Sequence, residues 1–531
     1  MSASLAIIFT LIGGVIALLV AIVAAFIISS NVRKNYQRQL ETQLKAQKDI
    51  SDEQLRTLRA TLQQQQQAQK ESLEKFIADY TPPPPAAAPV VVAAAPANGE
   101  DVQHESLPLR ARLIADKYAP GMNLRGTNLS GLDLSGANLR GTNLKQANLQ
   151  ETNLTGADLG DAQLSGADLK RTILTRANLG GADLSGADLN HATLIGADLL
   201  GADLGRADLS GTVLDESTQI EPKWRLAWEI INNGAPGRDL SRADLHDTDL
   251  WGADLRAARL WEADLSSARL LQADLRRAKL WRARIDDLTQ MDEKWRLTWE
   301  IVNNGAAGRD LRELDLSEAD LSRADLSRAA LTKTNLSRSD LSHADLSGAN
   351  LSGANLGRAS LINADAREAN LSGANLNGAN LSKADFSRAK MSWVDLRNTV
   401  VSEMTQIDPK WRLVWEIVNQ GAMQRDLSRV DLAGANLREA NLNGADLRAA
   451  KLWLADLAGA DMRGANLRST DMRESNLVGA DLSETTLQDT NLTGSRFDAN
   501  TRWPVGFDPI AAGAIARSGA ARPEPQREPI D

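Results

Sequence analysis

The chain has 531 residues, a net charge of −9 and no cysteine. The absence of cysteine excludes disulfides, thiolate catalysis and cysteine-ligated metal sites. Aromatic residues make up only 4% of the sequence, so the core of so long a chain must be built from smaller side chains such as Leu and Ala. Positive and negative side chains are dense and interspersed, as on an ordinary solvated surface, and do not indicate a single-signed surface that steers a charged partner.

Residues 1–30 are predicted to anchor the chain in a membrane. Leu5 to Ile28 contains no charged residue, and a helix of about 24 residues spans roughly 36 Å, enough for a bilayer core. Arg33 and Lys34 follow this stretch, and neither Lys nor Arg precedes it. This asymmetry favours an uncleaved single-pass anchor, N-out, with the rest of the chain in the cytoplasm. A cleaved export signal and the opposite orientation are the alternatives.

Residues 31–80 are predicted to form a helical stalk. Val32, Tyr36 and Leu40 begin a narrow apolar stripe at helical spacing, and no Gly or Pro interrupts it. Such a stripe fits either a coiled coil, through which the chain would form a homo-oligomer, or an isolated solvated helix. Residues 81–99 are rich in Pro and Ala, a composition typical of an extended polyproline-II linker. Together these segments would hold the remaining chain away from the membrane.

From Met122 onward the unit Ala-(Asp/Asn)-Leu-x-x recurs every five residues, with 63 Leu or Leu-like positions in total. Internal repetition of this kind defines the architecture before any local propensity does. The repeats fall into four blocks, which are predicted at residues 122–215, 238–286, 309–402 and 425–498.

The period of five predicts a four-sided parallel β-helix, an all-β solenoid. On an α-helix each five-residue step rotates by about 140° beyond a full turn, so the Leu residues would spiral around every side. On a flat strand an odd step turns every second Leu outward. A backbone that turns a right-angled corner every five residues buries all of them. Four such corners close one coil, with Leu and the small Ala inward and Asp or Asn outward.

These runs resemble the pentapeptide-repeat proteins, whose fold is a right-handed quadrilateral β-helix. A representative repeat is Gly196-Ala197-Asp198-Leu199-Leu200, and the resemblance covers about 60% of the chain. The right-handedness of the β-helix is implied by the family alone. The resemblance also implies a bacterial protein, and hence the bacterial inner membrane for the predicted anchor. The axial positions depart from Leu at a few places. Ala366 and Val401 are undersized there, and Phe386 and Phe497 are oversized, although family members often carry Phe at this position.

Three near-copies of one segment separate the blocks, at residues 216–237, 287–308 and 403–424. Each contains Lys-Trp-Arg-Leu-x-Trp-Glu-Ile and ends in an Asn-rich turn with Gly. Pro222 and Pro409 in the first and third copies, and the Gly at the end of each copy, predict a short helix. Its aromatic face either packs on the β-helix or forms a knob for a partner. Similar inserts occur in large bacterial members of the family without an assigned activity. The insert aromatic residues are Trp224, Trp228, Trp295, Trp299, Trp411 and Trp415.

The second block carries large apolar residues at outward positions. Trp251, Trp261, Leu271 and Trp281 each directly follow an axial Leu. Because four repeats complete one coil, Trp261 and Trp281 stack on one wall, and Trp251 and Leu271 stack on the opposite wall. Exposed apolar stripes often mark an interface, so these four residues form the candidate interface. The alternative is that the neighbouring insert helices cover them.

The ends of the solenoid need caps, because open coils expose backbone edges. Residues 100–121 are predicted as an N-terminal cap with an amphipathic helix, and residues 499–515 as a C-terminal cap. Trp503 to Pro509 resembles the terminator of many bacterial family members. Residues 516–531 are rich in Pro and charge and are predicted to be disordered.

The sequence predicts no catalytic residues, no cofactor and no metal site, and therefore no enzyme. The carboxylates are periodic and equivalent, whereas acid–base pairs need differing environments, and His191 and His343 lack partners at ligand spacing. The predicted function is a membrane-tethered scaffold for protein–protein interaction, with an unidentified protein partner and no nucleic acid. The alternative is a DNA mimic, since some small family members protect DNA gyrase in this way. The greater length, the inserts and the mixed charge of this chain depart from them.

Overall fold

The computed structural model describes residues 109–517. Within this range no helix has both the length and the apolar character of a bilayer span. The anchor, stalk and linker predicted for residues 1–99 lie outside the described residues. Of the tail predicted for residues 516–531, residues 518–531 also lie outside them, whereas Ala516 is ordered and pairs with Phe497. The first described element, α3 (Leu109–Asp116), precedes the first coil and buries Leu113.

The backbone winds into four-sided coils, as the period of five predicted. Each outward Asp or Asn pairs in parallel with the residue 20 positions further on, as in Asn138 with Asp158 and Asp158 with Asn178. Most of these pairings are single bridges. At two places the pairing extends over two residues and forms short parallel strands. There β1 (Arg269–Leu270) pairs with β2 (Gln290–Met291), and β3 (Arg496–Phe497) pairs with β4 (Ile515–Ala516). The β-helix is therefore held by hydrogen bonds between successive coils.

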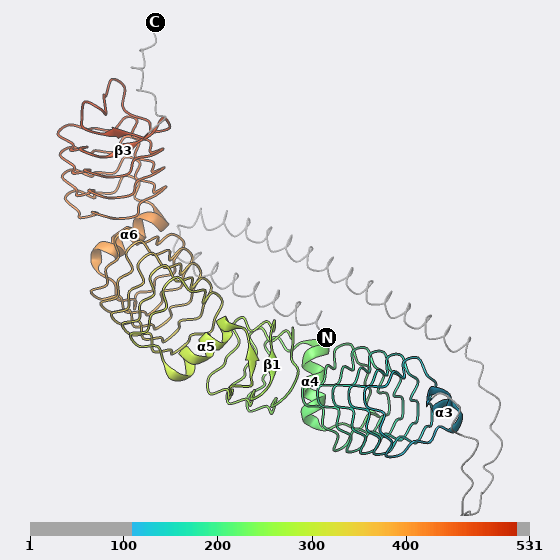
Figure 1. Cartoon of the computed structure of the whole chain (residues 1–531). Coiled ribbons are helices and arrows are strands. Elements are labelled where there is room, and N and C mark those ends of the chain that lie inside the picture. The colour runs from blue at the N-terminus through green and yellow to red at the C-terminus, as the bar shows by residue number, and fades with distance from the viewer. Residues whose placement is uncertain (1–108, 518–531) are drawn as a thin grey trace, which may run out of the picture. The chain divides into compact units, whose positions relative to one another are not determined.

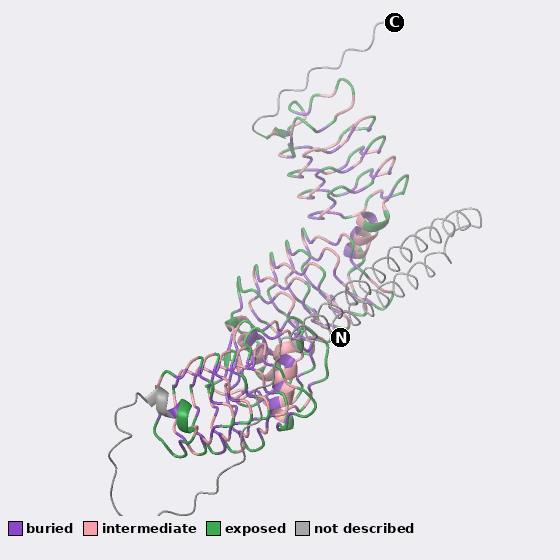
Figure 2. Ribbon diagram, turned by 90° about the vertical axis from the view of Figure 1, so that its right-hand side faces the viewer, coloured by how far each residue is buried: buried purple, intermediate pink, exposed green. Residues whose placement is uncertain are grey.

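The core runs along the axis of the coils. Nearly all axial Leu side chains are fully buried, and so are the Ala residues two positions earlier. Figure 2 shows this alternation of buried and exposed residues along each coil. The outward Asp or Asn stabilises the corner that follows, because its side chain accepts the backbone N–H two residues on, as Asp158 does from Gly160 at 3.0 Å. The corner itself needs a positive φ, which explains the many Gly residues there, such as Gly136 at 67°.

Two of the irregular axial residues, Ala366 and Phe386, compensate for one another. Asp365 and Asp385 pair on successive coils, which places the undersized Ala366 next to the oversized Phe386 on one wall. Both side chains are buried. A small and a large residue on neighbouring coils together fill about the volume of two Leu, and close packing of the axis is preserved.

Each block ends in the same widened turn. A Thr hydroxyl donates to the carbonyl oxygen of an axial Leu in the preceding coil, as Thr218 does to Leu194 at 2.9 Å. The coil thereby gains one residue, so that the bridge that follows joins Asp198 to Gln219, one position further than in a regular coil. The four equivalent residues are Thr218, Thr289, Thr405 and Thr501. The last of these begins the C-terminal cap, so the end of the solenoid reuses the turn that introduces each insert.

The three inserts form matching helices of 12 residues. These are α4 (Pro222–Asn233), α5 (Glu293–Asn304) and α6 (Pro409–Gln420), and each lies across the end of a stack of coils (Figure 1). Each ends at a Gly with positive φ whose N–H closes the last turn, as Gly305 does on the Ile301 carbonyl oxygen at 3.0 Å. The helices replace the missing next coil and cover an end that would otherwise expose the axis.

Each junction also keeps one corner of the β-helix connected. Within a block, a corner N–H bonds a carbonyl oxygen of the next coil, as from Gly186 to Gly205. Across the inserts the same kind of bond reaches past the whole helix. These bonds all measure 2.7 Å and join Arg206 to Asp247, Arg277 to Glu318 and Trp393 to Gly434. The insert therefore interrupts the coil but returns the chain to the same corner.

Candidate interaction surfaces

The repeated aromatic residues of the inserts pack into the solenoid ends. Trp224 lies in the buried cluster of the first block, whereas Ile230, further along the same helix, lies in the buried cluster of the blocks that follow. The second Trp of each helix donates its indole N–H to a carbonyl oxygen of the preceding coil, as Trp299 does to Ala283 at 2.7 Å. Of the two interpretations left open by the sequence, this placement fits packing on the β-helix.

An Asn in each insert closes the edge of the preceding coil. The Asn303 side chain donates to the carbonyl oxygens of Leu280 and Trp299 and accepts the backbone N–H of Arg282. Asn232 and Asn419 make the same three kinds of bond. One amide thus satisfies backbone groups that a following coil would otherwise have paired, which accounts for the Asn in the repeated motif.

The predicted Trp stripes of the second block remain exposed. Trp251, Trp261 and Trp281 keep 45%, 39% and 46% of their surface accessible, and Leu271 is half-buried. The backbone N–H of Glu262 bonds the Trp281 carbonyl oxygen, which places Trp261 and Trp281 on successive coils of one wall. Lys279 and Arg282 lie over the Trp261 and Trp281 rings at 5.5 and 4.3 Å. The insert helices therefore leave these rings accessible, framed by cations.

A second surface, which the sequence analysis missed, is a polar groove along one wall of the third block. Its volume is about 520 Å³, and it is open to solvent. The floor is low because the residues after the axial Leu are small there, with Ser337 and Gly357 in place of long side chains. Its side-chain ladder is Asp315, Asn335, Asn355, Asn375 and Asp395. Aligning the sequence of the block coil by coil would have brought these positions together.

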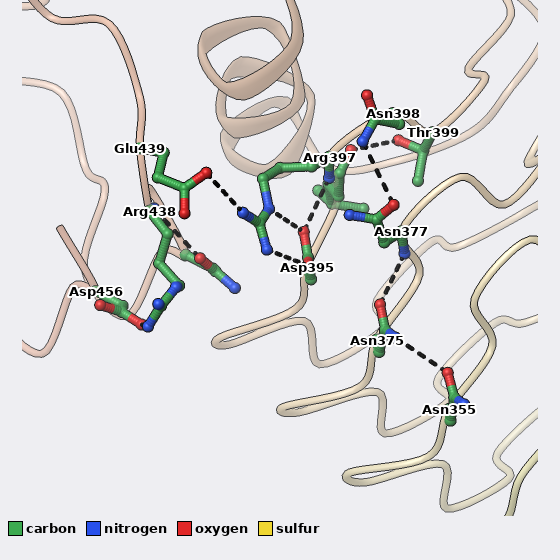
Figure 3. Close-up of polar contacts among 12 residues, drawn as sticks. Asn355, Asn375, Asn377, Asp395, Arg397, Asn398, Thr399, Arg438, Glu439 and Asp456 are labelled. Atoms are coloured by element: carbon green, nitrogen blue, oxygen red, sulfur yellow. Dashed lines mark hydrogen bonds and ion pairs between the residues drawn. The ribbon is translucent and has the colours of Figure 1, made fainter. Parts of the chain in front are cut away.

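Both ends of this groove abut neighbouring blocks. At one end Glu318 lies 3.8 Å from Arg276 of the second block and 3.4 Å from Arg338. At the other end Arg397 bridges Asp395 at 2.8 Å and Glu439 of the fourth block at 3.3 Å, as Figure 3 shows. Burial by itself would raise the pKa of Asp395, but the side-chain and backbone hydrogen bonds from Arg397 and its positive charge together lower this pKa below the ordinary value. The groove is therefore bounded along the axis by ion pairs.

One carboxylate at the first junction is buried. Asp249 accepts the backbone N–H of Trp251 and lies 2.9 Å from Arg269. Burial nevertheless raises its pKa above the ordinary 3.8, and Asp208 of the first block adds repulsion. The folded protein therefore binds this proton more tightly than the unfolded chain. The resulting stability is present below pH 3.8 and is lost as the pH rises through the folded-state pKa.

We expect Asp249→Asn to raise the thermal midpoint at neutral pH, because the variant removes a buried charge that Arg269 only partly balances. The gain should vanish below pH 3.8, where the wild-type carboxyl is protonated in both states. Melting curves measured by circular dichroism across the acid and neutral range test this. The control is Asp310→Asn, since Arg312 lowers the pKa of Asp310 to about 2, and neutralising it should be destabilising at neutral pH. A wild-type midpoint equal to that of Asp249→Asn throughout would contradict the prediction.

Within residues 109–517 no three His, Asp or Glu side chains form a group that could hold a metal ion. His191 and His343 are exposed corner residues with positive φ. The regular carboxylates are mostly engaged by the backbone two residues on or by Arg, as Asp365 is by Arg367 at 2.6 Å. The described surface offers arrays of polar and aromatic groups for contact.

These observations define a solenoid protein built from five-residue repeats. A family model described as "Pentapeptide repeats" matches more than half of the chain, so the chain belongs to the pentapeptide-repeat family, whose fold is a right-handed β-helix. The matched residues are 119–146, 133–171, 172–211, 243–282, 307–338, 339–378, 367–402, 426–464 and 460–498. The resemblance seen in the sequence is thereby confirmed at the level of the family.

Several solved structures are similar to the chain over parts of its length. HetL, a pentapeptide repeat protein from the cyanobacterium Nostoc involved in heterocyst differentiation regulation, is 21% identical with a TM-score of 0.18, covering 72% of this chain and 94% of HetL. Rfr23 from the cyanobacterium Cyanothece is 28% identical with a TM-score of 0.18, covering 21% of this chain and 96% of Rfr23. A trypsin-treated form of QnrB1, a plasmid-mediated fluoroquinolone resistance protein, is 14% identical with a TM-score of 0.13, covering 60% of this chain and 89% of QnrB1. Comparison with curated proteins gives no match.

Proposed function

We propose that the chain is a non-enzymatic scaffold, tethered to a membrane by its N-terminal segment, that presents its solenoid to a protein partner. The observation that carries the proposal is the exposed pair Trp261 and Trp281 on one wall. Large aromatic side chains are the commonest energetic centres of protein interfaces. A β-helix holds them rigidly on successive coils, so little conformational entropy is lost when a partner binds them.

The distribution of the other aromatic residues supports this proposal. The insert residues Trp224, Trp295 and Trp411 are buried, which accounts for them as packing. The packing of the solenoid does not account for Trp261 and Trp281 in the same way, because they are exposed at positions where most repeats carry polar residues. The neighbouring cations Lys279 and Arg282 would suit a partner surface with acidic groups around an apolar centre.

The alternative of a DNA mimic receives less support from the surface. A mimic of the duplex needs rows of uncompensated negative charge. Many outward Asp residues here instead form an ion pair with an Arg two positions further on. The guanidinium of Arg448 lies 2.6 Å from the Asp446 carboxylate, and that of Arg463 lies 2.7 Å from the Asp461 carboxylate. These ion pairs neutralise the rows along much of the fourth block.

We expect the double variant Trp261→Ala/Trp281→Ala to lose its partner. The full-length tagged protein is expressed in the source cells, membranes are solubilised, and co-purifying proteins are quantified by mass spectrometry. Removing two aromatic contacts from an interface centre should reduce recovery of the partner by about tenfold or more. Trp453→Ala, which removes an exposed Trp from the fourth block, is the matched control. Equal recovery with the double variant and the control, or no specific partner at all, would contradict the proposal.

A further inference from the structure

The polar groove of the third block is rich in hydrogen-bond donors. Each Asn amide has two N–H donors and one oxygen. In the ladder, Asn355 donates to the Asn335 side-chain oxygen at 3.1 Å, and Asn375 donates to that of Asn355 at 3.0 Å. Each oxygen also accepts a backbone N–H, as Asn355 does from Gly357 at 3.2 Å. Each oxygen therefore already accepts at least one hydrogen bond, whereas the second N–H of each amide has no partner among residues 109–517.

A cationic side chain lies beside these donors. Arg358 lines the groove and is exposed. Within residues 109–517 its guanidinium makes no hydrogen bond or ion pair. Its neighbours Arg338 and Arg397, by contrast, are already paired with Glu318, Asp395 and Glu439. The middle of the groove thus combines free amide N–H groups with one uncompensated positive charge, an arrangement that recognises carboxylates and carbonyl oxygens.

The opposite wall of the same block has the reverse character. Its outward row is acidic throughout and consists of Asp325, Asp345, Asp365 and Asp385. The two walls share one coil geometry and differ in their side chains alone. The donor character is therefore a local property of the groove and is not a consequence of the repeat.

We propose that this groove binds an extended acidic peptide segment of the protein partner, an inference that rests on the scaffold function proposed above. The lining runs over five coils, from Ser317 to Arg397, or about 19 Å at the usual spacing of about 4.8 Å between coils. An extended peptide of about six residues has this length. The lining is polar, with no large apolar residue, so the bound segment carries acidic and backbone polar groups rather than apolar anchors.

The charges around the groove favour a short acidic segment over a long polyanion. A polyanion that extends beyond the groove would meet the acidic row Asp325, Asp345, Asp365 and Asp385 of the same block. A short peptide places a few carboxylates against Arg358 and the amide ladder without bringing a dense array of charge along the acidic walls. Binding is expected to weaken as salt rises, because Arg358 is exposed to solvent.

The test uses full-length protein and a fluorescein-labelled hexa-glutamate peptide, with binding followed by fluorescence anisotropy. Arg358→Glu reverses the free charge and should weaken binding by about tenfold or more. Gly357→Leu fills the groove floor and should also abolish most binding. The fold tolerates a Leu at this position, since Leu200 directly follows an axial Leu in the first block. Circular dichroism melting establishes that each variant remains folded.

The matched control is Arg328→Glu. Arg328 occupies the same corner position with positive φ as Arg358, but beside the acidic wall, so the same charge change there should leave binding unaltered. Equal weakening by the control, no effect of Arg358→Glu, or no peptide binding would overturn the proposal. Binding of a tetragalacturonate or an oligonucleotide that depends on Arg358, in place of the peptide, would overturn it too. If a partner co-purifies equally with Arg358→Glu but not with the Trp261→Ala/Trp281→Ala variant, the groove proposal fails and the scaffold proposal stands.

Discussion

Replacing Trp295 with Ala is expected to lower the free energy of unfolding around α5 by about 3–5 kcal/mol, the usual cost of truncating a buried Trp. The ring is 7% exposed and belongs to the continuous core that joins the second block to the third. Its loss leaves a cavity within this core, which the surrounding side chains fill only in part. Hydrogen exchange of the α5 amides, read by mass spectrometry, measures the local free energy of opening.

Trp281→Ala provides the control for this prediction. Trp281 lies in the same block but keeps almost half of its surface exposed, so its removal should change exchange of the α5 amides little. If the two substitutions destabilise α5 to a similar extent, the buried insert Trp and the exposed Trp do not have the different roles assigned to them here, packing for Trp295 and partner binding for Trp281. Unchanged exchange in Trp295→Ala would show that α5 is not held by its aromatic face.

Replacing Asn303 with Ala is expected to cost about 2–4 kcal/mol at the same junction, because several backbone groups lose their partner at once. These groups are the carbonyl oxygens of Leu280 and Trp299 and the N–H of Arg282. Each partly buried backbone group deprived of its hydrogen bond costs about 1–3 kcal/mol, and water can restore some of the exposed ones. Denaturant unfolding followed by circular dichroism measures the loss.

Asn304→Ala tests whether this cost belongs to the hydrogen bonds or to the residue type. Asn304 is the next residue of α5 and is exposed, so its replacement removes an Asn from the same helical turn without removing a coil contact. It should change stability by less than about 0.5 kcal/mol. Equal effects of the two substitutions would rule out the edge-closing role of Asn303.

The solenoid itself could be predicted from the sequence because its signal is redundant. An inward Leu every five residues requires a backbone that turns a corner at each repeat, while the handedness came from the resemblance to the family. An irregularity such as Ala366 is absorbed by Phe386 on the next coil. The helix within each insert could be predicted as well, since Pro222 and Gly234 mark its ends. Both predictions rest on residues that are close together in the sequence.

The junctions could not be predicted because they depend on contacts across long separations. The hydrogen bond from the Arg277 N–H to the Glu318 carbonyl oxygen could be predicted only if the path of the insert were known, because the insert returns the chain to the corner at which it began. The side on which Trp295 packs depends on that same path, so the sequence left packing and docking as alternatives. The groove was missed although the regular register of 20 residues per coil, applied to the third block, brings its residues together. The groove depends on Gly357 lying beside both Asn355 and Asn375. Asn355 is close to Gly357 in the sequence, but Asn375 belongs to the next coil.

The three junctions share one consequence for the history of the chain. Because α4, α5 and α6 have equal length and connect equivalent corners, exchange of one insert for another adds or removes a whole block without shifting any axial Leu. Unequal recombination between the gene segments that encode the inserts would therefore produce longer or shorter proteins that still fold. The number of blocks can vary among descendants more freely than the contents of any single coil.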